Sequence, residues 1–186
     1  MDTTIGTMRI LGISGSLRRR SLNTAALRAA AEIADDDMKV EIFDLAGIPL
    51  YNPDDEAAHG FPPEVAELRR AVAEADALLI ATPEYNFSLT AALKNAIDWA
   101  SRGGSESPLN GKPAAILGSG GRFGTLRSQL HLREILLHND VRVVTSPQVM
   151  IDRGSDKFDE DLRLVDERTR GQIARLLASL RDLAAA

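Results

Sequence analysis

The sequence contains no cysteine. This absence excludes a disulfide framework, a thiolate zinc site, an iron–sulfur cluster and a cysteine nucleophile. It is typical of proteins that work in a reducing compartment, and we therefore expect a cytoplasmic location.

Long apolar runs and an excess of basic charge are absent as well. A membrane-spanning helix needs roughly 20 consecutive apolar residues, whereas Ala77 to Ala81 is one of the longer runs here. Residues 1–7 lack the basic start and apolar stretch of a signal peptide, so we expect a flexible tail. Lysine and arginine number 22 against 27 acidic residues, and this net charge of −5 disfavours nucleic-acid binding. We expect neither a membrane nor a nucleic acid as a partner.

The composition that remains is that of an ordinary globular protein, with 44% hydrophobic and 26% charged residues. A chain of 186 residues is close to the usual size of one domain and long enough to bury its own core. We see no internal repeat and no linker, so we predict a single domain over residues 8–186.

Short apolar segments alternate five times with segments of helical periodicity. The strands are expected at residues 9–14, 38–43, 76–82, 114–117 and 141–144, and the helices at 22–34, 62–75, 89–101, 125–138 and 159–184. This alternation predicts an α/β fold in which a parallel sheet carries helices on both faces. Ligands of such sheets bind at the carboxyl ends of the strands, so the loops at those ends are the candidate site.

The loop after the first strand, Gly15 to Asn23, combines hydroxyl and amide side chains with three consecutive arginines. A phosphate placed there would meet unpaired backbone N–H groups and the positive end of a helix dipole. Ser16, Arg18, Ser21 and Asn23 would add further donors. The alternative is structural, with Ser21 or Asn23 capping the helix and the arginines forming a solvated turn.

Two later loops are also unusual. Pro83 to Ser88 brings a glutamate, an amide and two aromatic rings to the edge of the expected site, where backbone groups would meet the rim of a planar heterocycle. Gly118 to Gly124 is rich enough in glycine for its backbone to approach a ligand closely. We expect its N–H groups and the helix start that follows to favour negative charge on a bound ring. The alternatives are a turn capped by Ser88 and a flexible surface turn.

Other chemistries find little support. The glycine spacings match neither the dinucleotide fingerprint nor the P-loop, because Gly111-Lys112 is followed by Pro113. The segment Gly12 to Ser16 lacks the final glycine of a hydrolase nucleophile elbow. The run Asp54 to Glu56 has no suitably spaced partners for a metal, so we predict a solvated turn and no metal site. His131 and His138 are expected to be surface or packing residues of one helix.

These loops resemble those of the NAD(P)H-dependent FMN reductase family, a flavodoxin-like group that includes quinone, azo-dye and chromate reductases. The resemblance runs from Met8 to nearly the end of the chain. It rests on Gly-Ser-Leu-Arg-x-x-Ser-x-Asn at Gly15 to Asn23, and on Pro-Glu-Tyr-Asn-x-Ser at Pro83 to Ser88 continuing into Leu93 to Trp99. One departure is the pair Thr90-Ala91, where the family often has Pro-Gly, and it leaves the entry to the following helix open.

The resemblance implies a three-layer, five-stranded parallel sheet in the order 2-1-3-4-5, with FMN as the cofactor and NADPH or NADH as the co-substrate. It implies three groups of cofactor-binding residues: Ser16, Arg18, Ser21 and Asn23 around the phosphate with Leu22 beside them; Pro83, Glu84, Tyr85, Asn86 and Phe87 bordering the isoalloxazine; and Ser119, Gly120, Gly121 and Arg122 near its pyrimidine side.

The implied reaction passes a hydride from nicotinamide to flavin N5 and then electrons to a small-molecule acceptor: a quinone, free flavin, azo compound or metal oxyanion. The chemistry belongs to the flavin, so no catalytic side chain is assigned. The resemblance also implies a homodimer or homotetramer. Two other functions stay open, a flavodoxin-like electron carrier without nicotinamide turnover and a domain of the same fold that binds no flavin.

Overall fold

The computed structural model describes residues 6–186, so most of the expected tail, residues 1–5, lies outside it. The strands are β1 (Met8–Ser14), β2 (Met38–Phe43), β3 (Ala77–Ala81), β4 (Pro113–Ser119), β5 (Arg142–Val143) and β6 (Val149–Ile151). The helices are α1 (Leu22–Ile33), α2 (Pro53–His59), α3 (Pro63–Glu74), α4 (Ala91–Ala100), α5 (Leu126–His138) and α6 (Glu167–Ala185). Among these residues, no helix has both the length and the hydropathy that a membrane span requires.

The strands form one parallel sheet in the order β2-β1-β3-β4-β5, which confirms the predicted topology. The strand that sequence analysis missed is β6, which pairs with Leu117 to Ser119 of β4, while β5 pairs with Pro113 and Ala114 of the same strand. The two short strands thus share one edge of the sheet. Pro147 lies between them, and proline lacks the N–H group that a continuous ladder needs. A three-residue strand leaves too little alternation to be read from sequence.

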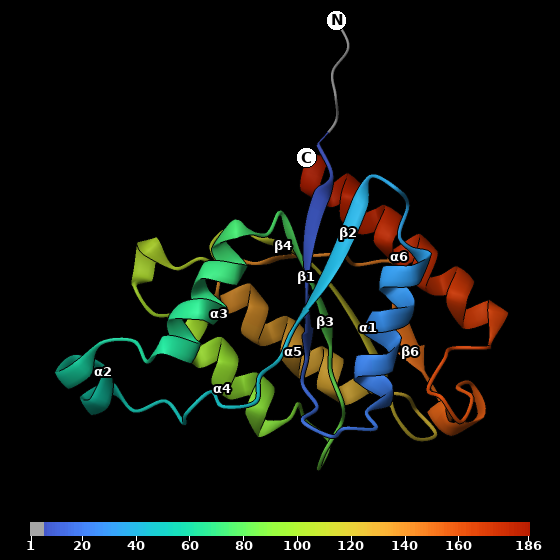
Figure 1. Ribbon diagram of the computed structural model, residues 1–186, viewed down its shortest axis with the longest axis horizontal. Coiled ribbons are helices and arrows are strands. Elements are labelled where there is room, and N and C mark those ends of the chain that lie inside the picture. Colours follow the sequence, from blue (N-terminus) through green and yellow to red (C-terminus); the bar gives the residue numbers. More distant parts are fainter. Residues whose placement is uncertain (1–5) are drawn as a thin grey trace, which may run out of the picture.

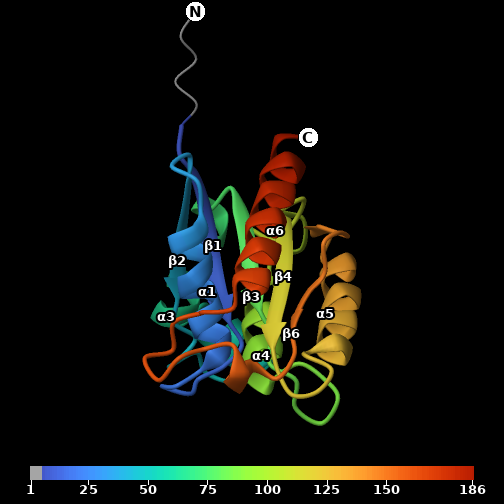
Figure 2. The ribbon, with the colours of Figure 1, turned by 90° about the vertical axis from the view of Figure 1, so that its right-hand side faces the viewer.

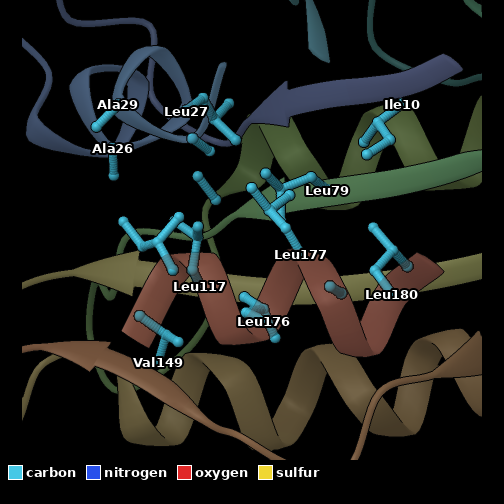
Figure 3. Close-up of a cluster of buried hydrophobic side chains, with 14 of the residues drawn as sticks. Ile10, Ala26, Leu27, Ala29, Leu79, Leu117, Val149, Leu176, Leu177 and Leu180 are labelled. Atoms are coloured by element: carbon cyan, nitrogen blue, oxygen red, sulfur yellow. The ribbon is translucent and has the colours of Figure 1, made fainter. Parts of the chain in front are cut away.

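Helices cover both faces of the sheet and give it three layers (Figure 1). On one face α1 and α6 pack against the strands, and on the other lie α3, α4 and α5 (Figure 2). Figure 3 shows the first of these cores, where Leu27 of α1 and Leu177 of α6 meet Leu79 of β3. Residues of β3 and β4 are buried on both faces, which explains their unbroken apolar runs.

The last helix begins later than predicted. The expected segment was 159–184, but α6 starts at Glu167, and Phe158 pairs with Leu164 in an isolated bridge before it. Leu162 has a φ of 63°, a left-handed conformation that does not fit a right-handed α-helix, so the helix cannot run through this residue. The apolar stripe is confirmed only from Ile173 onward, because Leu162 and Val165 precede the helix. The actual start is set by Asp166, whose carboxylate accepts hydrogen bonds from the backbone N–H (2.8 Å) and hydroxyl (2.5 Å) of Thr169.

The Asp166 cap predicts a pH-dependent contribution to stability. The hydrogen bonds from the Thr169 side chain and backbone lower the pKa of Asp166 below its ordinary value of 3.8. A carboxyl with a depressed pKa stabilises the fold above its unfolded pKa and loses that contribution as pH falls through the folded value. Asp166→Asn keeps a capping oxygen but does not titrate. We expect its Tm to fall less than the wild-type Tm when the pH is lowered from about 6 to about 3. Equal losses in the two thermal-unfolding series would contradict this assignment.

The acidic run at Asp54 to Glu56 is helical, contrary to the predicted turn. It lies in α2, where Asn52 caps the first turn by accepting from the Asp54 N–H at 3.0 Å. None of the residues of α2 is buried, so the helix has no apolar stripe from which sequence periodicity could have identified it. The predicted surface character of these carboxylates is retained.

Candidate functional site

A cavity of about 380 Å³ lies at the carboxyl ends of β1, β3 and β4, where the three loops singled out in the sequence meet. These loops lie together at the lower end of the molecule in both views (Figure 1, Figure 2). The lining comprises Ser16, Arg18, Ser21, Leu22, Asn23, Pro83, Glu84, Tyr85, Ser119, Gly120, Gly121, Arg153, Gly154 and Ser155. The structure therefore brings together all the predicted site residues except Asn86, Phe87 and Arg122, which lie outside this lining.

The first loop presents backbone donors and positive charge to the cavity. The buried Ser21 is the N-cap of α1, and its hydroxyl accepts from the Thr24 N–H at 3.2 Å. Among the described residues, no acceptor meets the N–H groups of Leu22 and Asn23, the first two of the helix. Arg18 is exposed, and no carboxylate of residues 6–186 lies within 4.0 Å of its guanidinium. The capping and anion-binding interpretations are thus compatible, because Ser21 caps one N–H and leaves two others free.

Asn23 ties the first loop to the third. Its Nδ2 donates to the Ser119 carbonyl and its Oδ1 accepts from the Ser119 N–H, both at 2.9 Å. The side chain is buried, and its amide pairs with the Ser119 backbone as a neighbouring β-strand would. Asn23 therefore offers its backbone N–H to the cavity, while its side chain, which the sequence suggested as a phosphate donor, holds Ser119 in place.

The second loop is a tight turn. Tyr85 and Ser88 exchange backbone hydrogen bonds at 2.9 and 3.0 Å, and Asn86 and Phe87 at the tip have φ values of 50° and 66°. These are the conformations of a type I′ turn, in which both central residues are left-handed. The turn projects Tyr85 at the edge of the cavity, with 54% of its surface exposed.

Glu84 anchors this turn to the start of α5, directly after the third loop. Its carboxylate accepts from the backbone N–H of Arg127 (2.9 Å) and of Ser128 (3.3 Å), and it forms an ion pair with the Arg127 guanidinium at 3.2 Å. Thr125, the N-cap residue of α5, makes no side-chain cap of its own. The positive end of α5 is therefore occupied by Glu84. This corrects the expectation that the start of this helix would stabilise negative charge on a bound ring.

Thr90 resolves the question raised by the Thr90-Ala91 pair. Its hydroxyl caps α4 by accepting from the Leu93 N–H at 3.3 Å, and it donates to the Gly15 carbonyl at 2.6 Å. The helix therefore begins at Ala91 rather than at the predicted Leu89, and its entry is bonded to the first loop. Ser88 is not the cap, since its hydroxyl meets Nδ1 of His131 at 3.0 Å.

The third loop depends on glycine at several positions, and Gly120 is one of them. A Cβ on Gly120 would lie 2.2 Å from the carbonyl oxygen of Gly124, so the chain folds back on itself more closely than any side chain allows. Gly121 and Gly124 then pair to close a second tight turn. The loop is thus a defined hairpin rather than a flexible surface turn.

Sequence analysis missed one wall of the cavity, formed by Arg153, Gly154 and Ser155. This segment follows β6, and its Arg153 and Gly154 N–H groups donate to the carbonyls of Gly121 (3.0 Å) and Gly120 (3.3 Å). Because β6 was not predicted, nothing placed these residues at the carboxyl edge of the sheet. The Arg-Gly-Ser sequence itself was the signal that could have drawn attention to them.

The cavity suits a flavin mononucleotide. Free N–H groups and Arg18 lie at the N-terminal start of α1, which is the arrangement that a phosphate monoester requires. The Tyr85 ring and the backbone of Gly120 and Gly121 stand on the other loops, where a flat ring would lie. The buried hydroxyl oxygen of Ser119 has no partner among the described residues, as expected of a polar group beside a polar ligand.

Comparison with known proteins agrees with this geometry. The family model for NADPH-dependent FMN reductase matches residues 8–156. An NAD(P)H-dependent FMN reductase of Pseudomonas aeruginosa is 52% identical over 174 residues, 93% of either chain, and an NADPH:quinone oxidoreductase of Arabidopsis thaliana is 41% identical over 181 residues, 93% of this chain and 90% of the relative. The solved structure of the flavoenzyme NAD(P)H:(acceptor) oxidoreductase FerB of Paracoccus denitrificans superposes with a TM-score of 0.86 at 30% identity, covering 96% of this chain and 97% of that one. The chain belongs to the NADPH-dependent FMN reductase family.

Proposed function

We propose that this protein is an FMN-dependent oxidoreductase that oxidises NADPH or NADH and reduces a quinone or another small-molecule acceptor. The overall reaction is balanced, because NAD(P)H, one proton and a quinone give NAD(P)⁺ and a hydroquinone. The observation that carries the proposal is the cavity itself, in which a helix start with two free backbone N–H groups adjoins two fixed turns. The quinone reductases among the relatives support the choice of acceptor class.

When bound, FMN supplies the redox chemistry by accepting hydride from nicotinamide and delivering electrons to the acceptor. The residues of the chain bind and orient it. Ser16, Arg18, Ser21 and the N–H groups of Leu22 and Asn23 would hold the phosphate, and Pro83 to Tyr85 with Ser119 to Gly121 would border the ring. Arg153 to Ser155 would form a further wall, in which Gly154 lies beside Leu22 and Ser119.

The alternative of an electron carrier without nicotinamide turnover is tested by steady-state kinetics. The purified protein should show a visible flavin spectrum and oxidise NADPH continuously when a quinone is supplied. A yellow protein with negligible turnover would favour the carrier. A colourless protein that fails to quench FMN fluorescence would exclude both functions.

Arg18 provides a direct test of the phosphate site. We expect Arg18→Ala to weaken FMN binding about tenfold, because a charge-assisted hydrogen bond contributes roughly 1.5 kcal/mol. The measurement is fluorescence quenching of FMN titrated with the apoprotein. Arg142→Ala, which removes another exposed arginine at the start of β5, is the matched control and should bind FMN like the wild type. Equal affinities for all three proteins would remove Arg18 from the site.

The proposal extends to assembly and location. We propose a homodimer or homotetramer, as the resemblance implies, and light scattering coupled to size exclusion measures the mass directly. A cytoplasmic location is proposed because the reductant, NADPH or NADH, is supplied there. A monomer in solution would correct the first of these and leave the redox function intact.

A further inference from the structure

A second cavity, of about 430 Å³, lies between the first loop, α1 and the carboxyl end of β2. We call it the β2 cavity. Its two walls, α1 and β2, lie side by side in both views of the molecule (Figure 1, Figure 2). It is slightly larger than the cavity of 380 Å³ assigned to the flavin, and the proposed flavin site leaves most of its lining unused.

Three arginines line the β2 cavity. Arg18 and Arg19 come from the first loop and Arg28 from α1, and all three side chains are exposed. Arg28 lies four residues after Thr24, another lining residue, so one face of α1 is turned toward the cavity. Among residues 6–186, no carboxylate lies within 4.0 Å of any of these three guanidinium groups.

The positive charge of this lining is only partly balanced. Asp44, directly after β2, is the one carboxylate that the described residues contribute to it. One oxygen of Asp44 is already engaged, because it accepts from the Ala46 N–H at 2.9 Å. Three guanidinium groups against one carboxylate make the β2 cavity attractive to anions, although the chain as a whole carries a net charge of −5.

Apolar side chains stand beside these charges. Leu17 and Ile42 both line the β2 cavity and leave 58% and 38% of their surfaces exposed. Folding gains little from apolar side chains that stay in water, whereas the faces of a flat base could cover them. The cavity therefore combines an apolar surface with unpaired guanidinium groups, which suits a purine base linked to a phosphate.

The β2 cavity adjoins the flavin cavity. Ser16 and Arg18 line both, so a long ligand can extend from one cavity into the other. The reductant of the proposed function is such a ligand, with nicotinamide at one end and adenosine at the other. In doubly wound sheets that bind dinucleotides, a carboxylate meets the ribose 2′-hydroxyl of NADH, or an arginine nearby accommodates the 2′-phosphate of NADPH.

We propose that the β2 cavity binds the adenosine 2′-phosphate of NADPH, and that Arg19 and Arg28 make the protein prefer NADPH to NADH. The inference rests on the proposed function and names its reductant. The two guanidinium groups pair with the phosphate, and Leu17 and Ile42 pack against the adenine. NADH has a hydroxyl group in place of this phosphate and gains neither ion pair.

Two adenosine ligands that carry no electrons isolate the effect of the 2′-phosphate. Adenosine 2′,5′-bisphosphate has this group and adenosine 5′-phosphate lacks it. Calorimetric titration of the FMN-loaded protein, whose flavin phosphate site is filled, gives both Kd values. We expect the wild type to bind the bisphosphate at least tenfold more tightly, and Arg19→Gln and Arg28→Gln each to reduce that preference about fivefold.

Arg175→Gln is the matched control. Arg175 is an exposed arginine of α6 with no carboxylate within 4.0 Å in the described part of the chain, and it lies outside the lining of the β2 cavity. The substitution removes the same charge from the same kind of position as Arg28→Gln. Its preference for the bisphosphate should equal that of the wild type.

Steady-state kinetics supply a second measurement. Arg19→Gln and Arg28→Gln should each raise the KM for NADPH about fivefold, because the lost contact binds the ground state and the transition state equally. The KM for NADH and both kcat values should stay at the wild-type level. A fall in kcat with both reductants would instead assign these arginines to the flavin site and overturn the inference.

The binding data can also overturn it. Equal affinity of the wild type for the two adenosine ligands would do so, as would a preference that survives in both Arg19→Gln and Arg28→Gln, because the phosphate would then bind elsewhere. Failure of the proposed function looks different. A protein without a flavin spectrum, or an FMN-loaded protein that oxidises neither NADPH nor NADH, is recognised before any adenosine ligand is added.

Discussion

Replacing Asn23 by alanine is expected to destabilise the folded protein by about 3 kcal/mol, because a buried backbone group left without a partner costs roughly 1–3 kcal/mol and this change orphans two. The two are the N–H and the carbonyl of Ser119, each bonded to the Asn23 amide at 2.9 Å. The third loop loses its connection to the first, so FMN affinity should fall together with stability. Urea unfolding measures the first effect and fluorescence quenching the second.

Asn110→Ala is the control for this change. Asn110 is exposed and its Nδ2 makes one hydrogen bond, to the Gly104 carbonyl at 3.0 Å. Its replacement should alter stability by no more than about 0.5 kcal/mol, as is usual for surface positions. If Asn23→Ala were equally mild, water would be satisfying Ser119 and the connection between the loops would carry little of the fold's stability.

The expected size of the effect reflects how the three loops are bonded to one another. Thr90 joins the second loop to the first through the Gly15 carbonyl, and Asn23 joins the first to the third. Glu84 completes the circuit by joining the second loop to the start of α5, directly after the third. The cavity is thus held in shape by the protein's own hydrogen bonds. A binding site fixed in advance spends less of its interaction energy on ordering its loops.

Local signals explain why so much of this architecture was predictable. The parallel sheet with helices on both faces followed from apolar runs alternating with helical stripes, and its strand order followed from the family resemblance. The candidate phosphate site was inferred from the position of Ser16 to Asn23 between a strand and a helix. Each of these inferences uses residues that are close in sequence. The same holds for the start of α3 at Pro63, which its proline predicted.

The features that escaped prediction depend on contacts between distant segments. Glu84 caps a helix 43 residues further along the chain, and Asn23 meets Ser119 across 96 residues. Both residues were predicted at the site and both line the cavity, but their partners cannot be read from spacing. The wall from Arg153 to Ser155 was missed because β6 has only three residues, too few for a periodicity to emerge.

Replacing Gly120 by alanine is expected to have the second large effect on stability, and the same change at Gly121 is the control. A Cβ at Gly120 would lie 2.2 Å from the carbonyl oxygen and 2.8 Å from the carbonyl carbon of Gly124, whereas a Cβ at Gly121 would meet nothing within 4 Å. Both clashing atoms are backbone, so the hairpin must open to accommodate a methyl group. We expect Gly120→Ala to cost about 3 kcal/mol, at the upper end of overpacking substitutions, and Gly121→Ala less than about 0.5 kcal/mol.

The same pair of variants tests whether the third loop belongs to the flavin site. An opened hairpin moves the backbone of Gly120 and Gly121 away from the cavity that both line. FMN affinity should therefore fall at least tenfold in Gly120→Ala and remain near the wild-type value in Gly121→Ala. The titration is made at a temperature below the unfolding midpoint of each variant, so that weaker binding is not confused with unfolding. A Gly120→Ala protein that is destabilised yet binds FMN normally would place the ring away from this turn and leave only the first two loops to hold it.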